Sequence, residues 1–289
     1  MRTRSSTAPP PVARAAVAAL AAFSVIEIMV AVSLLAVIIV GLLAMFYQVQ
    51  RAFRQGTAQV DVMEGGRAIM GFLNRELQQM APTDVAFTTN CLIINSESPV
   101  LRAATASTTQ TLSSGDVRTN LLRDLVFISK VNDEWQGVAY RISNSVSGVG
   151  TLYRMVMTTN DDSNPEIAQI AVSNMTRRIM EIPLTDLRAE FHPVLDGVVH
   201  FSATAYDRGG EYQTNAVFPS FGLGFAYLGT ALPSYLDLEL GALETGAVEK
   251  FRARAEVNAS RAATFLEQQA GRTHLFRQRV AVKAGSAAN

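Results

Sequence analysis

The feature that most constrains this chain is an uninterrupted apolar run close to its N-terminus. No charged residue occurs from Ile28 to Phe46, a stretch of 19 residues. At about 1.5 Å per residue, a helix of this length crosses the roughly 30 Å hydrocarbon core of a bilayer. One carboxylate, Glu27, stands at the start of the run. An acidic side chain inside a membrane span costs about 2.5–3.5 kcal/mol, so by default it marks a functional position that has a partner.

The residues before the run form a motif of fixed order: Ala22, Phe23, Ser24, Val25, Ile26 and Glu27. This order resembles the cleavage and methylation motif of type IV prepilins, in which a small residue precedes a Phe-Thr-Leu-Ile-Glu-like sequence. The resemblance implies that a prepilin peptidase cuts between Ala22 and Phe23 and that the new amino terminus on Phe23 is methylated. It also implies that Glu27 sets the assembly register by facing the terminal amine of a neighbouring pilin subunit. Ala22 stands where the family strongly prefers glycine.

Residues 1–22 form the leader in this interpretation, and two alternatives stay open. The leader holds Arg2, Arg4 and Arg14 before an alanine-rich stretch, as a secretory signal peptide does. The segment is then either an uncleaved signal anchor or a cleaved signal. Because the apolar run continues well past any Ala-x-Ala site, an anchor suits it better. The arginines before the span predict a single pass, with a cytoplasmic N-terminus and an extracytoplasmic C-terminal domain. The resemblance to prepilins implies that the membrane is the inner (cytoplasmic) one and that the domain is periplasmic.

Helical periodicity continues beyond the membrane segment. The apolar positions recur at intervals of three, four and seven residues: Val49, Phe53, Val60, Met63, Met70, Leu73, Leu77 and Met80. Pro82 ends the pattern, so we expect one helix over Phe23–Met80. Residues 23–46 would form its membrane half and residues 47–81 its amphipathic half. Gly65-Gly66 is the expected position of a kink or short break.

Residues 82–289 are rich in β-strand patterns. Short runs of β-branched, aromatic and alternating apolar residues predict strands at 91–95, 125–131, 138–143, 152–158, 198–206, 235–240 and 273–283. Asp207–Gly210 and Ser147–Gly150 have the composition of hairpin turns.

The other segments of this region have different patterns. Pro165–Met180 fits either a helix or a loop, and Glu244–Gln269 predicts a helix inserted before the last strand. Arg102–Asp116 is rich in Ser, Thr and Ala and predicts a mobile loop, and the tail at Ala284–Asn289 is expected to be disordered.

Several sequence segments extend the resemblance to the β-rich region: GVAYRIS, TLYRMV, LDGVVHFSATAYD and LPSYLDLEL. They look like the J-type minor pseudopilin of type II secretion and its pilus relatives. The helical insert looks more like the pilin-like proteins of Verru_Chthon cassettes. The resemblance implies an α+β fold, with a long N-terminal helix packed on a C-terminal, antiparallel, β-rich, pilin-like domain.

Composition gives no sign of catalysis, of a metal site or of a bound cofactor. The 25 basic and 25 acidic side chains balance, which argues against nucleic acid as a partner. The histidines, His192, His200 and His274, lack metal-ligand spacing, and His200 is expected to be structural. Cys91 lies in an apolar run, where a buried, unreactive thiol is expected.

The remaining candidate ligands are acidic. Asp133-Glu134 and the segment 160–164 carry oxygen ligands that suit calcium, but neither has the Asp-x-Asp-x-Asp-Gly spacing, so solvated turns are favoured.

The leading hypothesis is therefore a structural subunit of a type IV pilus-like or type II secretion filament. Its expected partners are prepilin peptidase, other pilin or pseudopilin subunits and the inner membrane. The alternative is a single-pass, membrane-anchored binding or adhesion module that is not assembled into a filament. A third hypothesis is a membrane-tethered hydrolase that uses one of the histidines.

Overall fold

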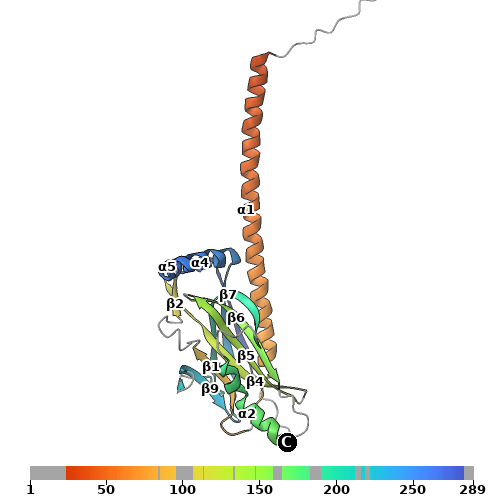
Figure 1. Cartoon of the computed structure of the whole chain (residues 1–289), viewed down its shortest axis with the longest axis vertical. Helices are drawn as coiled ribbons and strands as arrows, with labels where there is room; N and C mark the ends of the chain where they lie inside the picture. The colour runs from red at the N-terminus through yellow and green to blue at the C-terminus, as the bar shows by residue number, and fades with distance from the viewer. Residues whose placement is uncertain are drawn as a thin grey trace, which may run out of the picture. The chain divides into compact units, whose positions relative to one another are not determined.

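The computed structural model describes residues 24–83, 85–95, 107–112, 114–132, 134–146, 148–158, 165–182, 190–211, 216–218 and 222–282 (Figure 1). They belong to two units, Met1–Arg54 and Gln55–Asn289. The described part of the first unit is helical, and the second combines the end of the same helix with antiparallel sheet. The α+β class predicted from the sequence is confirmed.

The long helix, α1, spans Val25–Leu77. Beyond it, the Met80 N–H donates to the carbonyl of Leu77 at 3.2 Å, and Met80 then bridges to Ser129 of the sheet. The chain therefore leaves the helix shortly before Pro82, close to the predicted end. Phe23, the predicted start, lies outside the described residues.

The apolar face of α1 agrees with the predicted one at Met70, Leu73 and Leu77 and differs from it nearer the apolar run. The buried stripe consists of Val62, Gly66, Met70, Leu73 and Leu77. Three residues of the predicted face are exposed instead: Val49, Phe53 and Val60. At about 100° per residue, these three lie roughly 120° around the helix from the buried stripe. The helix thus carries two apolar stripes, of which its own domain buries one.

The described strands form one sheet of nine strands and a separate pair. The order of the large sheet is β11 (Thr273–Ala281), β10 (Tyr235–Leu243), β7 (His192–Tyr206), β6 (Val149–Thr158), β5 (Glu134–Val146), β4 (Arg123–Val131), β1 (Thr89–Asn95), β9 (Gly222–Leu228) and β8 (Ala216–Phe218). The small sheet pairs β2 (Ser107–Thr111) with β3 (Val117–Leu121). All seven predicted strands are present, and the strands that the structure describes pair antiparallel. One isolated bridge, from Leu122 to Phe201 of β7, is parallel.

The mobile loop predicted over Arg102–Asp116 is wrong in part. Its residues Ser107–Thr111 form β2, with Thr109 opposite Thr119 of β3. Threonine is β-branched and suits a strand once a partner is present, which composition alone did not reveal.

The two predicted turns have different outcomes. Val146 pairs with Val149 across the β5–β6 turn, where Gly148 has a φ of 90°, so this hairpin is confirmed. At the second predicted turn, Asp207–Gly210, the Gly210 N–H donates to the carbonyl of Asp207 at 3.1 Å, so a turn forms. However, β7 pairs with β6 and β10 rather than with β8, so this turn does not make a hairpin.

The helical segments resolve two further predictions. The segment Pro165–Met180, whose sequence fits either a helix or a loop, is a helix, α2 (Pro165–Glu181). The helical insert predicted over Glu244–Gln269 is confirmed, but it is not a single helix. It consists of α4 (Thr245–Val257) and α5 (Ala259–Glu267), followed by the short helix η1 (Ala270–Arg272).

The break between α4 and α5 falls at Asn258. This residue has an extended backbone, with φ −164° and ψ 118°. Its side-chain oxygen accepts from the backbone N–H groups of Ser260 at 2.8 Å and Arg261 at 3.3 Å. Asparagine at an N-cap satisfies donors that the first turn of a helix leaves without partners, and this stabilises the separate start of α5.

Strand alternation gives the large sheet two buried faces. On β4, Leu125 and Phe127 pack in the cluster that includes Leu73 of α1, whereas Val126 packs with Ile179 of α2. Helices α1 and α2 therefore cover opposite faces, as the period of two requires. A third cluster buries Phe251 of α4 and the apolar side of α5.

A polar cluster holds the end of α1 on its face of the sheet. The Glu76 carboxylate accepts hydrogen bonds from the Tyr140 hydroxyl and from the Arg154 guanidinium. The same guanidinium lies over the Phe72 ring, 4.8 Å from its centroid. Burial, and then the nearby Glu76 carboxylate, raise the pKa of Tyr140, so the tyrosine stays a neutral donor.

The short break expected at Gly65-Gly66 is not present, because α1 is continuous through both residues. These glycines instead allow close packing. A Cβ on Gly66 would lie 2.2 Å from a ring carbon of Phe276 on β11, and one on Gly65 would lie 3.5 Å from Leu195 on β7. Glycine is required at position 66 by the approach of the ring rather than by its backbone conformation.

Replacing Gly66 by alanine is expected to lower the free energy of unfolding by about 1–3 kcal/mol, because the added methyl overpacks against Phe276. The matched control is Gly71→Ala on the same helix, where nothing lies within 4 Å of the added carbon. This control should raise stability by up to about 1 kcal/mol through helix propensity. Denaturant unfolding in detergent micelles, followed by the fluorescence of Trp135, measures the free energy of unfolding of both variants. Equal effects of the two substitutions would contradict the packing role.

Candidate functional site

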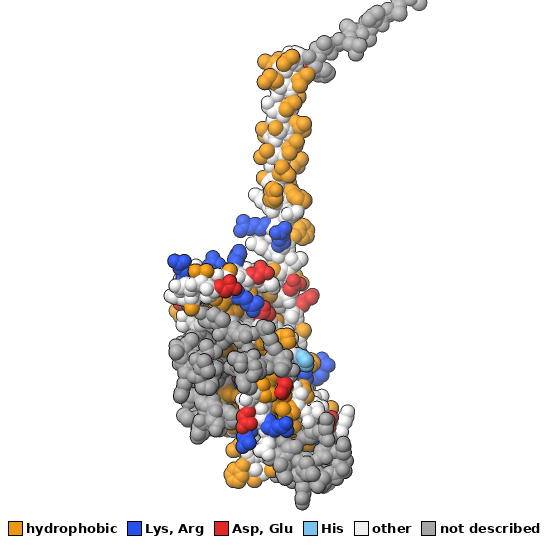
Figure 2. Space-filling model, in the orientation of Figure 1, with side chains coloured by type: hydrophobic (Ala, Val, Ile, Leu, Met, Phe, Trp, Pro, Cys, Tyr) orange, Lys and Arg blue, Asp and Glu red, His pale blue; other side chains and the backbone are white. Residues whose placement is uncertain are grey.

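The candidate site is the apolar part of α1 together with the turn that begins it. Every residue from Val25 to Val49 is exposed, and hydrophobic side chains cover the visible surface of this stretch (Figure 2). A helix that is apolar all round belongs either in a protein core or in lipid. No described residue buries this one, and it is long and apolar enough to span a membrane. The stretch is consistent with a single-pass anchor.

Glu27 lies in the first turn of α1. The carbonyl of Ser24 accepts from the N–H groups of Glu27 at 3.0 Å and Ile28 at 3.2 Å, and the Ser24 hydroxyl accepts from Ile26 at 3.3 Å. A carboxylate in the first turn interacts favourably with the positive end of the helix dipole. Among the described residues, none forms a salt bridge with Glu27. Ala22 and Phe23, the predicted cleavage and methylation positions, lie outside the described residues.

The polar groups within the apolar stretch are satisfied inside the helix. Ser33 carries the one hydroxyl between Ile28 and Phe46, and it donates to the carbonyl of Met29 at 2.8 Å. Because hydrocarbon offers no hydrogen-bond partners, a spanning helix must satisfy its polar groups internally. Among the described residues of this stretch, the Glu27 carboxylate is then the charged group that needs a partner from elsewhere.

The described residues contain no group of three or more His, Cys, Asp or Glu side chains that could hold a metal ion. Of the calcium candidates, Asp133 and residues 160–164 lie outside the described residues, and Glu134 begins β5. The His274 Nε2 lies 3.4 Å from a carboxylate oxygen of Glu244, and His192 is exposed at the start of β7.

His200 makes structural contacts, as predicted. Its Nδ1 accepts from the Leu121 N–H of β3 at 3.0 Å, and its Nε2 lies 3.1 Å from a carboxylate oxygen of Glu239 on β10. Burial lowers the pKa of the imidazole, opposed by Glu239. A neutral ring with Nδ1 as acceptor and an Nε2 proton shared with Glu239 satisfies both contacts and ties the small sheet to the large one.

Cys91 is buried in β1 and packs in the cluster beneath α1, as predicted. Burial raises the pKa of its thiol to about 12. The reactive thiolate is therefore scarce at neutral pH.

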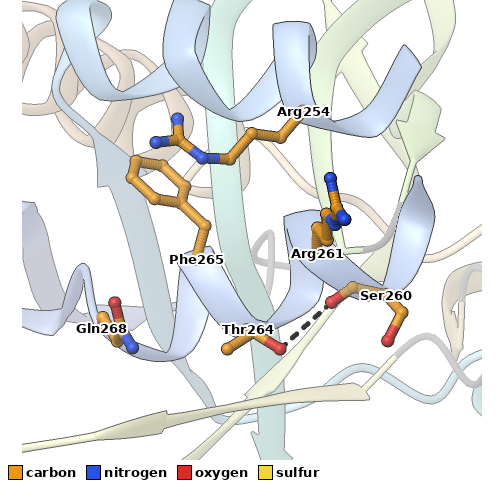
Figure 3. Close-up of a pocket in the computed structure, with 6 residues that line it drawn as sticks. All are labelled: Arg254, Ser260, Arg261, Thr264, Phe265 and Gln268. Atoms are coloured by element: carbon orange, nitrogen blue, oxygen red, sulfur yellow. Dashed lines mark hydrogen bonds between the residues drawn. The ribbon is translucent and has the colours of Figure 1, made fainter. Parts of the chain in front are cut away.

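A pocket that the sequence analysis missed lies on α5 and the end of α4 (Figure 3). It is lined by Arg254, Ser260, Arg261, Thr264, Phe265 and Gln268. The sequence signal for this pocket was the spacing of seven residues between Arg254 and Arg261. That spacing places the two side chains near one another only once both lie on helices.

The structure thus describes one of the three predicted site residues, Glu27. A scan against protein-family models and a search of curated proteins find no match to this chain.

Proposed function

We propose that this chain is a prepilin-like structural subunit, a minor pseudopilin of a type IV pilus-like or type II secretion filament. The observation that carries the proposal is Glu27, a carboxylate in the first turn of an exposed apolar helix with no salt bridge among the described residues. A plain anchor gains nothing from an acidic residue at this depth, because the charge only adds to the cost of insertion.

The position of Glu27 supports pairing with a neighbouring subunit. It follows Phe23 by four residues, which is one helical turn. After cleavage before Phe23, its own terminal amine would lie one turn away, and in a bundle of parallel helices the amine of an adjacent subunit would reach the same level. The pairing relieves two charges that are both costly in lipid.

The second apolar stripe of α1 supports assembly through this helix. Val49 and Phe53 are exposed beyond the apolar run, although a helix that served only as a tether has no need of apolar residues there. In a filament, neighbouring helices would cover them. A domain of about 200 residues after the helix is large for a repeating shaft subunit, which favours a minor role.

The arginines of the leader, Arg2, Arg4 and Arg14, support an inner-membrane location with the N-terminus in the cytoplasm. The β-rich unit would then lie in the periplasm. Prepilin peptidase and other pilin subunits are the partners that this route requires.

The test is the mature N-terminus, measured by intact mass and N-terminal peptide mass spectrometry on membrane-extracted protein. We expect a chain that begins at Phe23 and carries one added methyl group. A chain that still begins at Met1 or Arg2 would make Ala22 a non-substrate, and an anchored binding module would become the better account.

A further inference from the structure

We propose that the pocket on α4–α5 binds the phosphate of an anionic phospholipid headgroup. The inference rests on the membrane anchoring in the proposed function but not on filament assembly. Two guanidinium groups, two hydroxyls and an amide line the pocket, and none of its six lining residues is acidic. Arginine matches phosphate oxygens with paired, charge-assisted hydrogen bonds, so this donor set suits a phosphate better than a neutral or cationic ligand.

Arg254 is held in place before any ligand arrives. Its guanidinium lies over the Phe265 ring, 4.2 Å from the centroid, and one of its nitrogens donates to the carbonyl of Lys250 at 3.0 Å. Figure 3 shows the guanidinium lying against the ring at one side of the pocket. A side chain already ordered in this way loses less conformational entropy on binding.

Arg261 supplies the second positive charge. It lies in the first turn of α5, where Asn258 already accepts from the Ser260 and Arg261 backbone N–H groups. The ligand would therefore be held by side chains rather than by free helix amides. Neither Arg254 nor Arg261 forms a salt bridge among the described residues, whereas Arg252 on the same helix pair is bound to Asp196.

The hydroxyls and the amide complete the pocket. Thr264 donates its proton to the carbonyl of Ser260 at 3.1 Å, so within this pair the Ser260 hydroxyl is the one available as a donor to a ligand. Gln268 lies at the end of the pocket away from Ser260 (Figure 3). These neutral groups can bond phosphate oxygens at the sides while the guanidinium groups neutralise the charge.

The place of α4–α5 in the fold favours a lipid as the source of the phosphate. The two helices connect β10 to β11 at the end of the sheet where Phe276 packs on Gly66 of α1. This is the end at which α1 joins the β-rich unit, and only residues 47–61 separate Phe46 from Val62, the first buried residue of the helix. Because so few residues connect the anchor to the unit that carries α4–α5, lipid headgroups are within reach of the anchored protein.

The surface of α4–α5 suits contact with a membrane. Figure 2 shows basic side chains gathered over these helices, with some acidic ones among them. Val257, three residues after Arg254, is 74% exposed. An exposed apolar residue beside cationic side chains is typical of segments that lie on a membrane surface.

The test uses the full chain in neutral detergent and native mass spectrometry to count bound lipids. In detergent no bilayer surface potential attracts cations in general, so a local phosphate site is separated from diffuse attraction. We expect phosphatidylglycerol to bind at least about tenfold more tightly than phosphatidylcholine, and the double variant Arg254→Gln/Arg261→Gln to lose this preference. The matched control is Lys250→Gln, which removes an exposed charge on α4 that does not line the pocket and keeps the backbone carbonyl that Arg254 contacts. It should change the affinity less than about twofold.

Three results would overturn the proposal. Equal binding of the two lipids would remove the phosphate selectivity, and an equal loss in Lys250→Gln would show that general charge rather than the pocket is responsible. If inorganic phosphate displaces phosphatidylglycerol at similar concentrations, the ligand is free phosphate and the lipid assignment is wrong. The substituted residues lie in α4 and α5, so none of these results affects the N-terminal processing test, and a chain that is not processed could still bind the lipid.

Discussion

Replacement of Asp124 by alanine is expected to lower the free energy of unfolding by about 3–5 kcal/mol, because it leaves a buried guanidinium without its counter-charge. The Arg141 Nε donates to a carboxylate oxygen of Asp124 at 3.1 Å, and the two side chains are 6% and 2% exposed. The other carboxylate oxygen accepts from the Ile142 N–H at 3.1 Å. Loss of the carboxylate therefore removes partners from a buried cation and from a buried backbone donor.

Arg141 also connects this pair to α2. Its Nη1 donates to the carbonyls of Ile179 at 3.3 Å and Ile182 at 2.8 Å. An arginine left uncompensated would have to turn toward water and give up these contacts, so we expect α2 to loosen from its face of the sheet. Hydrogen exchange of α2 should rise more than that of β10, which lies away from the pair.

The control for Asp124→Ala is a solvent-exposed ion pair, Arg177 with Glu181, at 3.2 Å and 66% and 59% exposed. Arg177→Ala should change stability by no more than about 0.5 kcal/mol, since exposed pairs are screened. Denaturant unfolding in micelles measures both variants. Combining Asp124→Ala with Arg141→Met should cost less than the two single changes together, because neither charge then remains buried. A loss below about 1 kcal/mol in Asp124→Ala would show that the pair is not held in the buried state described.

Replacement of Glu27 by alanine is expected to leave membrane insertion intact and to reduce filament assembly by on the order of a hundredfold. The estimate follows from the cost of leaving one charge unpaired in a membrane span, about 2.5–3.5 kcal/mol. Insertion should not suffer, because the substitution removes a charge from an apolar helix. The membrane fraction reports insertion, and the amount of the chain in sheared filaments reports assembly.

Two further substitutions separate the charge from other effects. Glu27→Gln keeps the size and polarity of the side chain but removes the charge, and it should behave as the alanine variant does. Glu64→Ala makes the same chemical change at an exposed position of α1 beyond the apolar run, and it should assemble normally. If Glu27→Ala assembled as well as the unaltered chain, the register role would be wrong, whereas the lipid site on α4–α5 would be untouched.

Local pattern determined much of this protein. The uncharged run ending at Phe46 is exposed helix, and the seven strand predictions are correct because alternation of apolar residues reports directly which side chains a strand can bury. The buried position of Cys91 also followed from its apolar neighbours in the sequence. Each of these properties depends on residues that are close together in the chain.

Properties that depend on distant residues were decided by the tertiary structure. Gly66 was expected to weaken the helix, but the ring of Phe276, about 200 residues later in the chain, requires the missing side chain. The stripe with Val60 and the stripe with Met70 fit helical periodicity equally well, and only the sheet decided which one is buried. The break at Asn258 and the pocket that joins Arg254 to Arg261 arise because α4 and α5 must both pack their apolar sides in one cluster. Periodicity specifies which face of an element is apolar, whereas the choice of partner for that face is made by contacts that no local pattern contains.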